Sequence, residues 1–330
     1  MRKSVAQAGL LAAGVVILQA LLVMWFAWPA QKTAPRDLPV VVAGPAPAAT
    51  AVADKLRAER PGAFDISTVP DAATADQALR DREAYAAFVV APTGLSLHGA
   101  SAASPTVSTL LTQAVQQLAV QQPGSGRPVE VVDVVATPPD DPRGAAFASG
   151  FLPLLLTSLA AGIGLLFVVR SHLVRVGGLV TFAVLAGFVA AGILHGMGIL
   201  TGPYLATAGV IGLVALAISA GVAGLGAALG RPGVAVGVLA VFLVGNPISG
   251  IASAPELLPQ PWGTIGQFLP PGAGGTLLRS VAFFDGAGAT RSLWVLAAWA
   301  VGGLLLAAVG HYRDRAAATT PTRERELVPA

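Results

Sequence analysis

The sequence contains no cysteine, which excludes a disulfide framework, thiolate metal sites and thiol catalysis. Charge is also scarce, because only 11% of the residues are charged, against about 25% in typical soluble domains. In contrast, 54% of the residues are hydrophobic, a proportion that indicates an integral membrane protein. The formal net charge is only +3, so the composition gives no support to nucleic-acid binding.

The few charges are unevenly distributed along the chain. Residues 31–143 hold 9 basic and 12 acidic side chains, whereas residues 144–310 hold only seven charges. We therefore expect a polar domain between one hydrophobic segment and a hydrophobic block. The expected organisation is a cytoplasmic N-terminus and first transmembrane helix over 1–30, an extracytoplasmic mixed α/β domain over 31–143, a five-helix transmembrane domain over 144–310 and a cytoplasmic tail over 311–330.

The hydrophobic stretches are long enough to cross a bilayer, whose core of about 30 Å needs roughly 20 apolar residues in a helix. Six stretches qualify, at approximately residues 8–28, 147–169, 177–199, 205–229, 233–251 and 292–310. The predicted fold class is therefore a polytopic α-helical membrane protein with six transmembrane helices and a small α/β extracytoplasmic domain between helices 1 and 2. No Asp, Glu, Lys or Arg falls inside these spans, which disfavours ion-coupled transport.

Basic residues near the ends of the spans predict the orientation, because Lys and Arg favour the cytoplasmic side. The outside short loops carry only Arg279 and Arg291. The short inside segments carry nine basic residues: Arg2, Lys3, Arg170, Arg175, Arg231, Arg313, Arg315, Arg323 and Arg325. We expect a multi-pass protein of the plasma membrane with both termini in the cytoplasm. A cleaved signal peptide is the alternative at the N-terminus, but its apolar run of about 18 residues exceeds the roughly 7–15 that are usual.

The polar domain shows short apolar runs separated by Pro and Gly, which predict strands alternating with helices. The expected order is β-α-β-α-β-β-α-β: strands at 38–42, 64–69, 85–90, 94–98 and 129–135, and helices at 48–60, 71–83 and 105–122. Ser104 is the expected N-cap of the last helix. Nothing here indicates catalysis: we expect Asp76, Asp81 and Glu83 on solvated helix faces, and Asp140, Asp141 and Arg143 at the N-terminus of span 2.

Within the spans, His195 is the single titratable residue, for which an interhelical hydrogen bond is favoured over a proton relay. Gly226 and Gly230 form a Gly-x-x-x-Gly pair that, with Gly221 and Gly224, predicts close helix packing. The sequence contains no Gly-x-x-x-x-Gly-Lys-Ser/Thr loop, so any ATP that drives this protein must bind to another chain. After span 5, residues 252–290 are apolar but broken by prolines, which favours a re-entrant or interfacial helical pair on the outer face over a surface loop.

This pattern resembles the membrane subunits of type-2 ABC exporters, in the branch related to the phage-infection protein. The resemblance lies in one anchor helix, a large outside domain and five further spans. Its motifs are the strand Leu38-Pro39-Val40-Val41-Val42, the helix Asp76-Gln77-Ala78-Leu79-Arg80, Asp141-Pro142-Arg143-Gly144 before span 2, the break Asn246-Pro247-Ile248-Ser249-Gly250, then Leu269-Pro270-Pro271 and Leu278-Arg279. The resemblance implies a separate cytoplasmic ABC ATPase and pairing with a second permease chain as a homodimer or heterodimer.

By the same resemblance, the loop between spans 2 and 3 would contact the ATPase through Arg170, His172 and Arg175. The outer segment, with Asn246, Pro247, Pro270, Pro271 and Arg279, would gate release of an amphiphilic or lipid-like substrate. No catalytic residue, cofactor or metal site is expected. Membrane lipid is expected to surround the transmembrane helices. A membrane-anchored envelope binding or scaffold protein without transport activity is the alternative, and a membrane enzyme is a third, disfavoured hypothesis.

Overall fold

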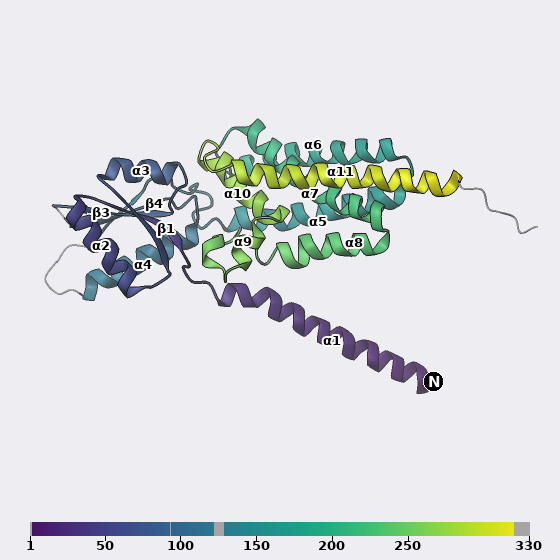
Figure 1. Cartoon of the computed structure of the whole chain (residues 1–330), viewed down its shortest axis with the longest axis horizontal. Coiled ribbons are helices and arrows are strands. Elements are labelled where there is room, and N and C mark those ends of the chain that lie inside the picture. The colour runs from purple at the N-terminus through teal and green to yellow at the C-terminus, as the bar shows by residue number, and fades with distance from the viewer. Residues whose placement is uncertain (1, 93, 122–128, 320–330) are drawn as a thin grey trace, which may run out of the picture.

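The computed structural model describes residues 2–92, 94–121 and 129–319. It consists of a small domain built on a β-sheet, here called the sheet domain, and a bundle of long helices beside it (Figure 1). The N-terminal helix α1 (Arg2–Gln31) diverges from the bundle and joins it near its C-terminal end. There the indole Nε1 of Trp25 donates to the carbonyl of Leu243 at 2.6 Å, and its ring meets that of Trp262 edge-on at 5.4 Å.

The sheet domain has the predicted order of elements. These are β1 (Leu38–Ala43), α2 (Ala46–Glu59), β2 (Phe64–Val69), α3 (Ala72–Arg80), β3 (Ala86–Ala91), β4 (Gly94–Gly99), α4 (Pro105–Gln121) and β5 (Glu130–Asp133). The last strand is shorter than predicted. The expected N-cap of α4 is confirmed, because the hydroxyl of Ser104 accepts the amide of Val107 at 3.2 Å.

The strands form one five-stranded sheet in the order β2-β1-β3-β4-β5, in which only the β3–β4 pair is antiparallel. Alternate residues of β1 face opposite sides: Val40 and Val42 lie in the core under α2 and α4, and Val41 lies in the core under α3 (Figure 1). Both cores also contain side chains from the bundle end of the chain, since Leu257 lies in the first and Phe284 in the second.

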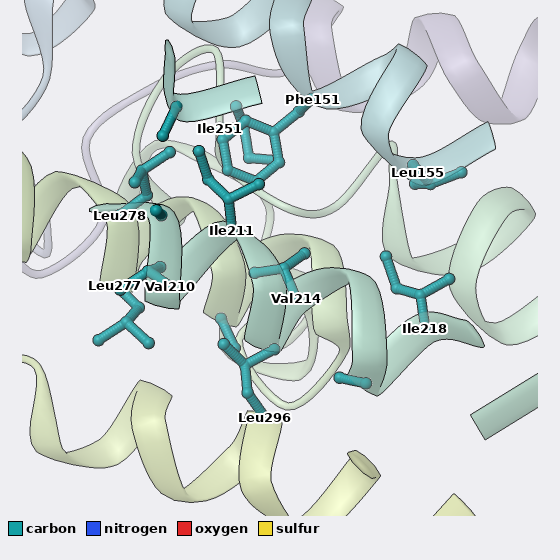
Figure 2. Packing of buried hydrophobic residues seen from close by; sticks show 14 of the residues in the cluster. Phe151, Leu155, Val210, Ile211, Val214, Ile218, Ile251, Leu277, Leu278 and Leu296 are labelled. Atoms are coloured by element: carbon teal, nitrogen blue, oxygen red, sulfur yellow. The ribbon is translucent and has the colours of Figure 1, made fainter. Parts of the chain in front are cut away.

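The bundle is built around α7. In its apolar 18-residue stretch 72% is buried inside the protein, a larger share than in the other membrane-length helices described. Its elements are α5 (Ala145–Val168), α6 (His172–Gly196), α7 (Tyr204–Leu229), α8 (Arg231–Val238), the π-helix η1 (Leu239–Gly245), the 3-10 turn η2 (Pro255–Leu257), α9 (Trp262–Gly266), α10 (Pro270–Phe283) and α11 (Thr290–Thr319). Figure 2 shows side chains of α5, α7, α10 and α11 meeting in one apolar core, with Ile211, Leu278 and Leu296 among them.

Five helices in the described part of the chain are long and apolar enough to cross a membrane: Lys3–Gln31, Ala145–Val168, His172–Gly196, Tyr204–Leu229 and Thr290–Gly310. They make this a largely helical protein suited to a membrane. The stretch predicted as a fifth span over 233–251 is helical only over Arg231–Gly245, so its predicted end is wrong. Asn246 still has helical backbone angles, but Pro247 after it has no backbone N–H with which to continue the helical hydrogen bonds.

Small residues allow the helices to approach closely, as predicted. Gly224 of α7 lies against the backbone of Gly303 on α11, and Gly187 of α6 lies against the backbone of Ala208 on α7. Gly226 is likewise covered by side chains of α5 and α8, but the prediction for Gly230 is wrong. Gly230 has φ +70° and makes the turn between α7 and α8, a conformation that glycine adopts without strain.

The proline-broken segment 252–290 folds into η2, α9 and α10 at the end of the bundle that meets the sheet domain (Figure 1). Pro270 and Pro271 occupy the first turn of α10, where proline costs no hydrogen bond. Most of α10 is buried, so this part of the segment is not the surface loop that was the alternative interpretation.

Candidate functional site

A cavity of about 360 Å³ lies where the sheet domain meets the bundle, and we call it the junction pocket. Its wall combines the turn after α3, the loop before and through η2, and parts of α9, α10 and α11. The lining residues with large polar side chains include Arg82, Tyr85, Glu256, Gln267, Arg279 and Arg291. Segments almost 200 residues apart in the sequence therefore supply one polar site.

Arg82 reaches the pocket from a helix end with unusual backbone geometry. It has φ +59°, its amide donates to Leu79, and the amide of Glu83 donates to Ala78, which together form a Schellman motif. Glycine is usual at this position, and another residue costs on the order of 1 kcal/mol or more. Because its side chain also lines the cavity, this conformation makes Arg82 a candidate functional residue.

The side chain of Arg82 connects the sheet domain to α10. Its Nη1 donates to the carbonyl of Thr276 at 2.9 Å and to the hydroxyl of Ser280 at 2.6 Å. The guanidinium also lies 5.2 Å from the centre of the Phe284 ring, within the range of a cation–π contact. Burial lowers the pKa of Arg82, although Tyr85 and Glu256 oppose this effect.

Tyr85 and Glu256 form a second connection across the pocket. The hydroxyl of Tyr85 donates to Oε2 of Glu256 at 2.8 Å. Burial raises the pKa of Tyr85 well above its ordinary value, and the negative charge of Glu256 adds to this effect. Tyr85 is therefore a stable hydrogen-bond donor, and the Glu256 carboxylate is satisfied by a neutral group instead of an arginine.

Arg279 and Arg291 contribute two further cations. Arg279 is only 6% exposed, its Nη2 donates to the carbonyl of Ile251 at 2.8 Å, and its guanidinium lies 4.5 Å from the centre of the Phe147 ring. Arg291, at the exposed start of α11, lies 4.7 Å from the centre of the Phe268 ring. A buried charge is normally paired, so the partners of Arg279 bear directly on what the pocket can do.

None of the three arginines forms an ion pair with a carboxylate of the described residues within 4.0 Å. The hydrogen-bond acceptors of Arg82 and Arg279 are backbone carbonyls and one hydroxyl. Across the described ranges, no group of three or more His, Asp or Glu side chains could hold a metal ion. The chemistry that the junction pocket offers is therefore a set of cationic hydrogen-bond donors.

The residues predicted to contact an ATPase lie together at the far end of the bundle. Arg170 is exposed in the connection between α5 and α6, and His172 begins α6. Arg175 donates from Nη2 to the carbonyl of Val169 at 2.8 Å, which satisfies a backbone group at the end of α5. Arg175 therefore stabilises the helical hairpin, and Arg170 is the exposed one of the three predicted contact residues.

The residues predicted for the outer gate lie at the opposite end, beside the sheet domain. Asn246 follows η1, and its carbonyl accepts the hydroxyl of Ser249 at 2.8 Å, while Pro247 is partly buried in the same turn. Pro270 and Pro271 open α10, and Pro271 lies against Gly245. Of these five residues only Arg279 lines the junction pocket.

Other predicted polar residues have structural partners. Asp141 accepts the amides of Ala146 and Phe147 at 3.1 and 2.8 Å, so its predicted capping of α5 is confirmed. His195 lies 3.0 Å from the hydroxyl of Thr207 on α7, the interhelical hydrogen bond that was favoured.

The expectation for Asp76 is wrong, because its Oδ1 lies 2.6 Å from Nδ1 of His98 and the two side chains are only partly exposed. Asp81 is exposed as expected and accepts the side-chain amide of Gln77. Glu83 is also exposed and stands at the edge of the junction pocket.

Three residues of the junction pocket were not predicted from the sequence: Arg82, Tyr85 and Glu256. One signal was present, because Glu256 and Arg279 are among only seven charges in residues 144–310. Charges are costly in a membrane block and mark functional positions.

Comparisons of the chain with known protein families, with characterised proteins and with solved structures found no match.

Proposed function

We propose that this chain is the membrane-spanning permease subunit of an ABC-type exporter, which moves an amphiphilic or lipid-like substrate outward with energy from a separate cytoplasmic ATPase. The observation that carries the proposal is the location of the basic residues. Helices α5, α6 and α7 run in alternating directions, so the α5–α6 connection and Gly230 lie away from the sheet domain, as do the N-terminus and the end of α11 (Figure 1).

Arg170, Arg175 and Arg231 all lie at that end, which the positive-inside rule assigns to the cytoplasm. The sheet domain and the junction pocket are then outside, next to Trp25 and Trp28, where aromatic residues favour the membrane surface. Six crossings require the helix Arg231–Gly245, which is about 22 Å long, and the turn after it. Such an irregular end is tolerated at membrane depth when protein covers it.

The exposed Arg170 lies in a connection of only three residues between α5 and α6, held by Arg175. We assign Arg170 to contact with the ATPase, because a short, well-fixed hairpin can pass a movement to both helices. In the part of the chain that the structure describes, α1 presents most of its surface away from the bundle. That surface supports pairing with a second permease chain, with lipid around the remainder.

The experiment that tests the proposal is purification of the full chain from its own membranes in mild detergent, followed by measurement of ATP hydrolysis. Hydrolysis is expected to co-purify with the wild type and to fall about tenfold in Arg170→Glu, since a repulsive charge at an interface costs on the order of 1.4 kcal/mol or more. Arg143→Glu is the matched control, because Arg143 is also exposed but precedes α5 at the opposite end.

The control variant is expected to keep the activity of the wild type, and the melting temperature of each variant shows whether it is folded. If the folded wild type carries no ATP hydrolysis, the exporter assignment is wrong. The membrane-anchored binding or scaffold function would then replace it.

A further inference from the structure

The junction pocket holds more positive charge than its own carboxylates neutralise. Arg82, Arg279 and Arg291 line it, against Glu83 and Glu256. Asp141 interacts electrostatically with Arg279 from outside the pocket, but its oxygens already accept the amides of Ala146 and Phe147. Glu256 already accepts a hydrogen bond from Tyr85, and the exposed Glu83 is solvated. Removing cations from water is unfavourable unless an anion accompanies them, so the pocket is suited to an anion from outside the chain.

The donors are of the type that binds oxyanions. Arg82 contacts the bundle through Nη1 and Arg279 through Nη2, and each guanidinium carries further N–H groups beyond these. Planar guanidinium groups match the oxygens of phosphate and carboxylate, often in pairs. The volume of about 360 Å³ lies within the range of about 300–1,000 Å³ that is typical of ligand pockets.

The wall of the pocket is also held in place, as a binding site requires. The side-chain Nε2 of Gln267 donates to the carbonyl of Ser249 at 2.9 Å, and its side-chain Oε1 accepts the hydroxyl of Thr276 at 2.7 Å. These bonds connect α10 to the segments on either side of the cavity. A preorganised wall reduces the ordering cost of binding.

An exposed apolar surface adjoins the charged lining. Arg291 lies over the ring of Phe268, which is 53% exposed, and Ile265, one turn before Phe268, is 39% exposed. A ligand with a charged group in the pocket can therefore place an apolar part against this surface. That combination favours an amphiphile over a fully polar ion.

From these observations we infer that the junction pocket binds a phosphate oxyanion, carried by the headgroup of an anionic lipid or by a small soluble phosphate ester. Arg279 supplies the buried charge, and Arg291 supplies the accessible charge between the pocket and the apolar surface. The inference does not rest on the proposed transport function, because the pocket would bind the same group in a scaffold protein.

The test is titration of the purified full chain, in phosphatidylcholine mixed micelles, with phosphatidylglycerol and separately with glycerol 3-phosphate. Arg291→Gln is expected to weaken phosphatidylglycerol binding about tenfold, the effect of losing one charge-assisted contact. Glu83→Gln is expected to strengthen it, because a competing carboxylate is removed. Arg143→Gln, with the same loss of charge outside the pocket, is expected to bind as the wild type does.

Binding of phosphatidylglycerol alone identifies a lipid headgroup as the ligand, and equal binding of glycerol 3-phosphate identifies a soluble ester; either result supports the inference. The inference is overturned if neither compound binds above the phosphatidylcholine background. It is also overturned if Arg291→Gln and Arg143→Gln lower the affinity equally. Because no ATP hydrolysis is measured, this failure is distinguishable from failure of the exporter proposal.

Discussion

Replacement of Gly303 by alanine is expected to destabilise the bundle, whereas the same replacement at Gly302 is not. Gly303 on α11 lies directly against α7, where a Cβ atom would stand 2.5 Å from the backbone nitrogen of Gly221. A Cβ atom on Gly302 would meet no atom within 4 Å. The two residues are adjacent on one helix, so the pair separates helix packing from helix propensity.

The expected magnitude follows from the distance. Ordinary contacts of a Cβ atom begin at 3.4 Å, so α7 and α11 must separate by about 0.9 Å to admit the methyl group. A gap of about 0.5–1 Å forfeits a quarter to a half of the van der Waals attraction between the atoms that it parts. Overpacking of this kind costs about 1–3 kcal/mol, and Gly302→Ala should be neutral or gain up to about 1 kcal/mol from helix propensity.

The assay is unfolding of both variants and the wild type in the same detergent, followed by tryptophan fluorescence during heating and during titration with dodecyl sulfate. Gly303→Ala should unfold at a lower temperature and a lower dodecyl sulfate fraction than the wild type. If Gly303→Ala and Gly302→Ala unfold together, close contact between α7 and α11 does not limit stability and the reasoning is refuted.

Two further predictions concern Asp141 and Tyr85, whose side chains form hydrogen bonds with the bundle end of the chain. Asp141→Asn should lower the melting temperature, because one backbone amide of α5 loses a charged acceptor worth about 1–3 kcal/mol. The control Asp140→Asn, at the exposed neighbouring residue, should leave the melting temperature unchanged. Equal melting temperatures of the two variants would contradict the capping role of Asp141. The pKa of Tyr85 in the folded protein is raised above its ordinary value of 10.0. The stability that Tyr85 contributes is therefore complete below pH 10 and declines above it, because the unfolded chain loses the proton first. The wild type should accordingly lose stability between pH 10 and 11 more steeply than Tyr85→Phe. Parallel pH profiles of the melting temperature would show that Tyr85 is not protected.

The order of elements in the sheet domain was predictable because its signals are local. The strands are short runs of apolar or alternating residues, and proline or glycine separates them from the helices, such as Pro61 and Gly62 between α2 and β2. The order of the strands within the sheet was not predicted. It depends on pairing between segments far apart in the sequence, such as β4 with β5, for which no local residue pattern exists.

The junction pocket shows the same limit more strongly. Arg279 was selected from the sequence as a rare charge in an apolar segment, but Arg82 looked like one of many charges in a polar domain. Only the packing of the turn after α3 against α10 brings the two into one cavity. The end of the helix Arg231–Gly245 was predicted too late for a different reason, because apolar residues such as Ile248 and Ile251 continue after the helix has ended at Gly245.

The presence of Leu257 and Phe284 in the two cores of the sheet domain has a consequence for how that region can be handled. Leu257 is fully buried and Phe284 is 5% exposed, so an isolated fragment of residues 31–143 would lose these two side chains, one from each core. Each such side chain contributes about 1.5–3 kcal/mol through burial. We therefore expect the sheet and the adjoining helix ends to unfold together. An isolated fragment would expose apolar surface that is buried in the intact chain.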